Sequence, residues 1–138
     1  MILNVAGIMI EKIYNELANY FENIQINDYV IMPNHFHCII EIVGVESIST
    51  QNDIHNKNRV DIESTPTTTI PNIIQTFKRY TTLEYIKMVK NNELPNFDKR
   101  IWQRNYYENI IRNDEIHQKI IEYIENNPLK WENDKYYT

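Results

Sequence analysis

Apolar residues in the first third of the chain follow a helical period and then give way to β-forming runs. Between residues 8 and 21 they are spaced three and four apart, with polar residues opposite, which predicts an amphipathic helix. The apolar set is Ile10, Ile13, Tyr14, Leu17, Tyr20 and Phe21. Residues 24–32 and 35–43 then read as strands, and Pro33-Asn34 between them favours a tight turn. The pattern predicts a helix followed by a β-hairpin.

The middle of the chain predicts a long loop and then two helical segments. The stretch at about 44–69 is rich in Ser, Thr, Asn and Asp, has little periodicity, and is expected to be an exposed polar loop. Pro71 suits the first turn of a helix. A helical stripe over 70–80 follows, and a second segment over 83–89 continues it after Thr81-Thr82.

The last third predicts one strand and one helix. The aromatic-rich stretch 100–107 reads as a third strand. Asn113 is a suitable N-cap for a helix that runs to about Asn126, and Pro128 stops that helix. The tail over 130–138 suggests no clear element.

Strands and helices that do not alternate strictly suggest an α+β fold, with an antiparallel sheet and helices packed on one face. A length of 138 residues predicts a single domain over 1–138. A single cysteine, Cys38, excludes an internal disulfide. The sequence has no apolar run long enough to cross a bilayer and no basic N-terminal flank of a signal peptide, so a cytoplasmic protein without a membrane partner is expected.

The charge is unevenly distributed. A net charge of −5 argues mildly against nucleic acid as a partner, yet residues 75–104 carry seven basic and three acidic groups. Four of these cations are candidates for contacts with a DNA backbone, namely Lys78, Arg79, Lys87 and Arg104. An evenly solvated helical surface explains the same charges equally well.

Two short stretches carry the candidate chemistry. His35 and His37 are two apart in a predicted strand, so both imidazoles point to one face, roughly 6–7 Å apart at the backbone. Tyr123 and Asn127 are four apart in a predicted helix and share a face, about 6 Å apart along the axis. If the helix lies over the strand, two imidazoles and an amide oxygen can bind one cation, with a phenol beside it. These are the parts needed to cut a phosphodiester by covalent catalysis.

Each of these residues also has a purely structural interpretation. Two histidines spaced in this way are commonly a polar pair on a solvated strand, and Tyr123 fits a half-buried helix position against the sheet. Asn127 fits the end of a helix before a proline. Tyr106 and Tyr107 are rival nucleophiles, but they precede the last helix and have no amide four residues later. They are ranked lower, as core or DNA-stacking aromatics.

The motifs resemble a known family. Pro33-Asn34-His35-Phe36-His37 is similar to the HUH motif of single-tyrosine transposases that act on single-stranded DNA, and the stretch over 101–131, with Tyr-Ile-x-x-Asn-Pro, resembles the REP-associated tyrosine transposase branch. The resemblance covers most of the chain outside about 44–66. It implies a ferredoxin-like domain, and the family's usual strand ahead of the first helix has no counterpart here.

The resemblance also implies an activity. Mg²⁺ or Mn²⁺ would be held by His35, His37 and Asn127, although imidazoles also accept Zn²⁺ or Ni²⁺. Tyr123 would be the nucleophile that leaves a 5′-phosphotyrosine, and the partner would be hairpin-bearing single-stranded DNA in a bacterial cytoplasm. The chain would act as a monomer or as a homodimer that exchanges the tyrosine helix. The alternative is a truncated or domesticated relative that binds hairpin DNA without cleaving it.

Overall fold

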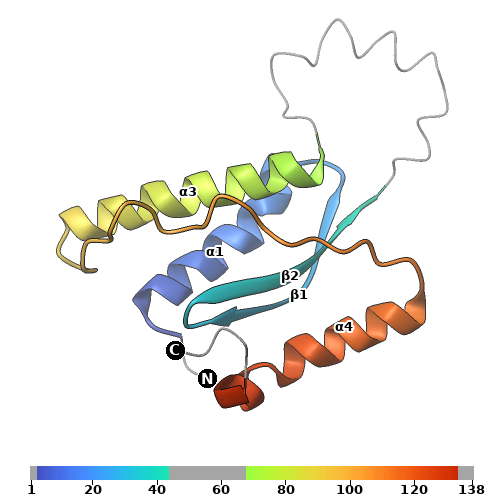
Figure 1. Ribbon diagram of the computed structural model, residues 1–138. Helices are drawn as coiled ribbons and strands as arrows, with labels where there is room; N and C mark the ends of the chain where they lie inside the picture. Colours follow the sequence, from blue (N-terminus) through green and yellow to red (C-terminus); the bar gives the residue numbers. More distant parts are fainter. Residues whose placement is uncertain (1–2, 44–67, 134–138) are drawn as a thin grey trace, which may run out of the picture.

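The computed structural model describes residues 3–43 and 68–133, with side chains up to residue 130 (Figure 1). The predicted loop at 44–69 therefore lies almost entirely outside the described residues. The elements, in chain order, are α1 (Val5–Tyr20), β1 (Ile24–Met32), β2 (His35–Ile42), α3 (Ile70–Lys90), α4 (Asp114–Asn126) and the short 3₁₀ helix η2 (Pro128–Asn133). No helix among these described residues is long and apolar enough to cross a membrane.

The predicted β-hairpin is confirmed. β1 and β2 pair antiparallel, and Met32 faces His35 across the two-residue turn. The register shifts between Ile26 and Tyr29. At this irregularity the hydroxyl of Tyr14 lies 3.2 Å from the carbonyl oxygens of both Asn27 and Ile39. The wholly buried tyrosine of α1 thus reaches both strands where their regular pairing is interrupted.

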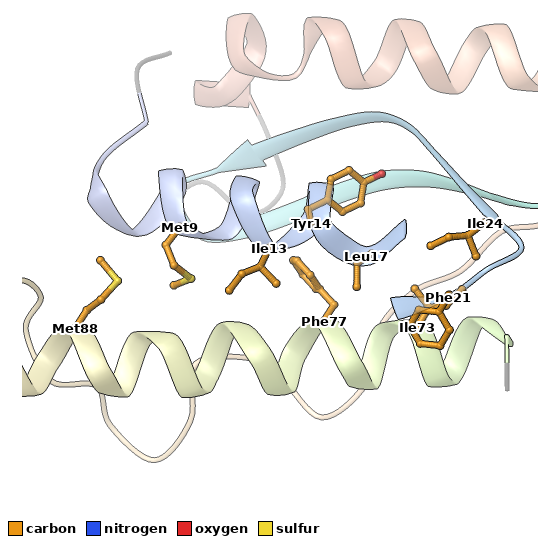
Figure 2. Close-up of a cluster of buried hydrophobic side chains, with 9 residues drawn as sticks. All are labelled: Met9, Ile13, Tyr14, Leu17, Phe21, Ile24, Ile73, Phe77 and Met88. Atoms are coloured by element: carbon orange, nitrogen blue, oxygen red, sulfur yellow. The ribbon is translucent and has the colours of Figure 1, made fainter. Parts of the chain in front are cut away.

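One face of the hairpin is covered by α1 and α3, and the main core lies between them (Figure 2). Phe36 stacks on Phe77 of α3 with ring centroids 5.1 Å apart, and it meets Tyr14 edge to face at 5.2 Å. Cys38 packs against the same core. The prediction that Phe36 and Cys38 have packing roles, on the face opposite the histidines, is confirmed.

The other face is covered by α4. Side chains alternate along β2, so His35, His37 and Ile39 lie opposite Phe36 and Cys38. Three buried residues lie outside the main core, namely Met32 of β1, Ile39 of β2 and Ile124 of α4. The predicted α+β class with an antiparallel sheet is confirmed, and the arrangement is consistent with part of a ferredoxin-like fold. Two helices share one face, whereas α4 packs on the face that carries the histidines (Figure 1).

The prediction of a third strand over 100–107 is wrong. Within the described residues the sheet has two strands, and no strand precedes α1. The stretch instead runs along α3, where the indole Nε1 of Trp102 donates a 2.7 Å hydrogen bond to the hydroxyl of Thr81. The ring of Trp102 also contacts Phe77, at 5.5 Å between centroids. Trp102, one of the aromatic residues that indicated a strand, thus packs on a helix rather than within a sheet.

Two further boundaries differ from the predictions. The segments on either side of Thr81-Thr82 form one continuous helix, α3, and the buried hydroxyl of Thr81 donates to the carbonyl of Phe77 within it (2.8 Å). At the C-terminus, η2 occupies residues for which no element was predicted. The N-cap at Asn113 is confirmed, since its side chain accepts a hydrogen bond from the backbone N–H of Ile116 at 2.8 Å.

Candidate active site

The two histidines lie side by side at the start of β2. Their ring centroids are 4.8 Å apart and the rings are nearly perpendicular, at 79°. The Nε2 atoms of both rings are shielded from solvent. The period of two along the strand therefore produces the predicted pair of neighbouring imidazoles, with a ring nitrogen of each directed away from water.

Tyr123 of α4 lies against this pair. The rings of His37 and Tyr123 meet edge to face, with centroids 5.4 Å apart and an angle of 75° between the planes. The tyrosine is 50% exposed. The candidate nucleophile is thus beside the imidazoles of its own chain and is still accessible from solvent.

Asn127 lies one helical turn after Tyr123, at the C-cap of α4. Its backbone N–H donates to the carbonyl of Ile124, and its own carbonyl accepts from the N–H of Lys130 at the start of η2. The side chain is only 4% exposed, and its Nδ2 has no hydrogen-bond partner among the described residues. A buried amide nitrogen without a partner is costly, which makes this side chain a candidate for contact with a bound group.

The donor set fits a metal ion that keeps open coordination positions. Within the described residues no group of three or more His, Cys, Asp and Glu could hold a metal. The two Nε2 atoms and the carboxamide of Asn127, whose oxygen and nitrogen exchange places in a half-turn of the amide, are the candidate donors instead. Nitrogen and oxygen donors with sites left for water and phosphate suit Mg²⁺ or Mn²⁺, and also Zn²⁺.

Comparison with known proteins places this chain in a family. The family model described as "Transposase IS200 like" matches residues 55–127. This chain belongs to the IS200-like transposase family. The match takes in α3 and α4 with Tyr123 and Asn127, and it begins after the hairpin that carries the histidines. DNA transposition is therefore its general function, and the narrower REP-associated branch stays a prediction.

A relative covers the hairpin as well. The transposase is 37% identical, over 139 residues, to a protein of Haemophilus influenzae that is described as uncharacterized. The similarity covers 99% of this chain and 72% of the relative. No solved structure matches the chain.

Lys78, Arg79 and Lys87 lie on α3, the backbone carbonyl of Arg104 lies near Lys78, and α3 covers the sheet face opposite the histidines (Figure 1). Arg79, Lys87 and Arg104 are exposed. Lys78 is not directed to open solvent: its Nζ lies 2.8 Å from the carbonyl oxygen of Gln103 and within 3.5 Å of the next two carbonyls. Burial lowers the pKa of Lys78. The ammonium of Lys78 thus joins the backbone of residues 103–105 to α3. The other three cations remain candidates for contact with phosphate.

The rival tyrosines lie elsewhere. Tyr106 sits beneath the ammonium of Lys78, which is 5.7 Å from the ring centroid, so Tyr106 belongs to the α3 side of the molecule. Tyr107 is 88% exposed. A shallow pocket in this stretch has a volume of about 300 Å³ and is lined by Gln103, Arg104, Asn105, Tyr106 and Tyr107. The prediction that these aromatics stack on DNA bases is compatible with their exposure.

One residue next to the histidines was missed as a site residue. Asn34 was assigned only to the turn, but its Oδ1 lies 2.9 Å from Nδ1 of His35. The sequence shows that a carboxamide directly precedes the first histidine, but not that its oxygen faces the ring. Cys38 has no place in the site, since burial raises the pKa of its thiol to about 12 and leaves it un-ionised.

Proposed function

We propose that this transposase cuts and rejoins single-stranded, hairpin-bearing DNA with a divalent metal ion and a 5′-phosphotyrosine intermediate. Tyr123 is the nucleophile, and His35, His37 and Asn127 are the metal ligands. The observation that carries the proposal is the edge-to-face contact of Tyr123 with His37 in the same chain. Membership of a transposase family supports it independently.

The metal would be held by Nε2 of each histidine and by the carboxamide oxygen of Asn127. The buried Nδ2 of Asn127, which has no partner within the described part of the chain, supports this assignment. When bound, a divalent ion of this kind polarises a non-bridging oxygen of the scissile phosphate. The half-buried histidines and the buried amide restrict water around that oxygen, which strengthens electrostatic interactions with it.

Tyr123 supplies the covalent chemistry. Its phenolic oxygen attacks phosphorus in line and forms the P–O bond of a 5′-phosphotyrosine, while the bond from phosphorus to the 3′ oxygen breaks. That oxygen takes up a proton and leaves as a 3′-hydroxyl, and the phenol proton passes to solvent, to which Tyr123 is half exposed. Attack by another 3′-hydroxyl reverses these steps and restores the phenol. Because a phosphodiester is exchanged for a phosphodiester, rejoining requires no ATP.

The contact of Tyr123 with His37 within one chain supports a candidate site provided by a single protomer. The tyrosine helix packs on the hairpin of its own protomer, and α4 contacts β1 directly. We therefore propose that a monomer is competent for cleavage and does not need to exchange α4 with a second subunit.

The test is formation of a covalent adduct with an end-labelled hairpin oligonucleotide and Mn²⁺. The wild-type protein should give a labelled band that survives denaturation, and Tyr123→Phe should give none. Tyr106→Phe and Tyr107→Phe are matched controls, since Tyr106 lies against Lys78 of α3 and Tyr107 is exposed, and both variants should retain the adduct. An adduct that persists in Tyr123→Phe overturns the assignment of the nucleophile. Tight hairpin binding without any adduct would instead identify a binding protein that does not cleave.

A further inference from the structure

We propose that Asn34 is a positioning residue: it fixes the tautomer of His35 and so directs the lone pair of Nε2 toward the metal site. This inference rests on the proposed function, because it assigns a second residue to the same site. It starts from one contact, the 2.9 Å separation between Oδ1 of Asn34 and Nδ1 of His35.

The chemistry of the two atoms determines where the ring proton is. A carboxamide oxygen can only accept a hydrogen bond, so Nδ1 of His35 must be the donor. A neutral imidazole carries one ring proton, and with that proton on Nδ1 the Nε2 atom presents its lone pair. Nε2 is the nitrogen that is shielded from solvent. The contact therefore leaves a metal-binding lone pair on the buried side of the ring.

The turn does not by itself require an asparagine. Met32 pairs with His35, so Pro33 and Asn34 are the two residues of the hairpin turn. Positive φ values at non-glycine residues occur at Asn92 and Lys99 in the described part of the chain, and not in this turn. One reason for asparagine in a turn is its tolerance of a left-handed backbone, and this turn does not use that tolerance. The backbone conformation of the turn therefore does not explain the asparagine, whereas the contact with His35 gives its side chain a role.

The tautomer of His35 should affect the affinity for the metal ion. In the other tautomer the Nε2 proton would occupy the position of the metal, and the lone pair of Nδ1 would face the carboxamide oxygen. Hydrogen bonds of this kind orient metal-binding imidazoles in proteins, and their loss typically weakens metal binding by about 10- to 100-fold. We expect Asn34→Ala to show a loss in this range. Asn34→Asp, which keeps an acceptor at the same position, should bind at least as tightly as the wild type.

The first experiment uses the metal-free protein, so it does not depend on activity. Nitrogen-15 NMR of the histidine ring, at about pH 8.5 where free imidazole is neutral, distinguishes a protonated Nδ1 from a protonated Nε2. The wild type and Asn34→Asp should show His35 with the proton on Nδ1, and Asn34→Ala should shift it toward Nε2. Pro33→Ala is the matched control, because it alters the same turn and leaves the carboxamide in place. An Asn34→Ala spectrum identical to that of the wild type overturns the inference.

The second experiment measures Mn²⁺ binding by calorimetry for the same four proteins, with circular dichroism to verify that each is folded. Affinity should fall about 10- to 100-fold in Asn34→Ala and remain near the wild-type value in Pro33→Ala and Asn34→Asp. Equal losses in Asn34→Ala and Pro33→Ala would show that only the turn matters, and would overturn the positioning role. A wild-type protein that carries the Nδ1 proton but binds no Mn²⁺ would contradict the proposed function. It would also contradict a role of Asn34 in metal binding. The conclusion that Asn34 fixes the tautomer of His35 would still hold.

Discussion

The imidazole of His37 and the phenol ring of Tyr123 meet edge to face at 5.4 Å, although they come from opposite ends of the chain. This contact joins the hairpin to α4 through the ring of the tyrosine and leaves half of the side chain exposed. The ring and the hydroxyl of Tyr123 consequently have separable roles. The ring holds the helix on the sheet, and the hydroxyl is available for chemistry.

Substitutions at Tyr123 should separate these roles. Tyr123→Phe keeps the ring contact and should leave the free energy of unfolding within about 0.5 kcal/mol of the wild type, whereas Tyr123→Ala should lower it by about 1 kcal/mol. Urea denaturation of the metal-free protein measures both. If Tyr123→Phe is as unstable as Tyr123→Ala, the hydroxyl supports the fold, and a lost DNA adduct could no longer be attributed to the nucleophile.

Asn127 should show a conflict between stability and metal binding. Asn127→Leu removes a buried amide whose Nδ2 has no partner within the described residues, so the metal-free protein should be as stable as the wild type or more stable. Mn²⁺ binding should be lost with the oxygen donor. Denaturation in EDTA and calorimetry provide the two measurements.

The neighbouring Asn126 supplies the control for this experiment. It is exposed at the end of α4, and Asn126→Leu should change neither property substantially. A metal-free Asn127→Leu protein that is destabilised by more than about 1 kcal/mol would mean that the carboxamide makes a structural hydrogen bond. The site would then need a different third donor.

Local sequence patterns predicted those parts of the fold that depend on local geometry. The shared face of His35 and His37 follows from the period of two in a strand, and the shared side of Tyr123 and Asn127 follows from the helical turn. The stretch over 100–107 shows where such reasoning stops. Its aromatic residues favour an extended backbone, but the sequence does not reveal that Trp102 will find its partner in Thr81 of α3 rather than in a strand.

The role of Asn34 was missed for a related reason. Asparagine next to proline is an ordinary turn pair, so the sequence explained it without reference to its neighbour. Only the position of the side chain shows that its oxygen faces Nδ1 of His35. Likewise, nothing in the pattern around Thr81 revealed that α3 continues through this residue or that its hydroxyl bonds within the helix.

Two lysines of α3 should respond differently in DNA binding. The ammonium of Lys78 is engaged by backbone carbonyls, whereas Lys87 is exposed. Lys87→Met should reduce the salt dependence of single-stranded DNA binding by about 0.7 in the log–log slope, the value for one lost phosphate contact. Lys78→Met should leave the slope unchanged and lower the free energy of unfolding by about 1 kcal/mol. A slope that falls equally in both variants would show that Lys78 leaves the carbonyls to contact phosphate.

Thr81 should matter for stability through Trp102. Its hydroxyl donates to the carbonyl of Phe77 and accepts from the indole N–H, so Thr81→Val leaves a partly buried donor without its acceptor. We expect the free energy of unfolding to fall by about 1–3 kcal/mol. Thr82→Val, at the less buried neighbouring position, is the control and should change it far less. Similar losses in both variants would indicate a general effect of valine on the helix.

Cys38 should make the protein sensitive to alkaline pH. Burial raises the pKa of its thiol to about 12 from an ordinary value of 9.0, so the unfolded chain loses this proton at a lower pH than the folded protein does. The contribution of the thiol to stability is complete below about pH 9 and declines as the pH rises toward 12. Tyr14, whose pKa is raised chiefly by burial, acts in the same direction. The free energy of unfolding, measured in urea between about pH 8 and 10.5, should therefore fall less steeply in Cys38→Ala than in the wild type. Parallel curves would mean that the thiol is as easily ionised in the folded protein as in the unfolded chain.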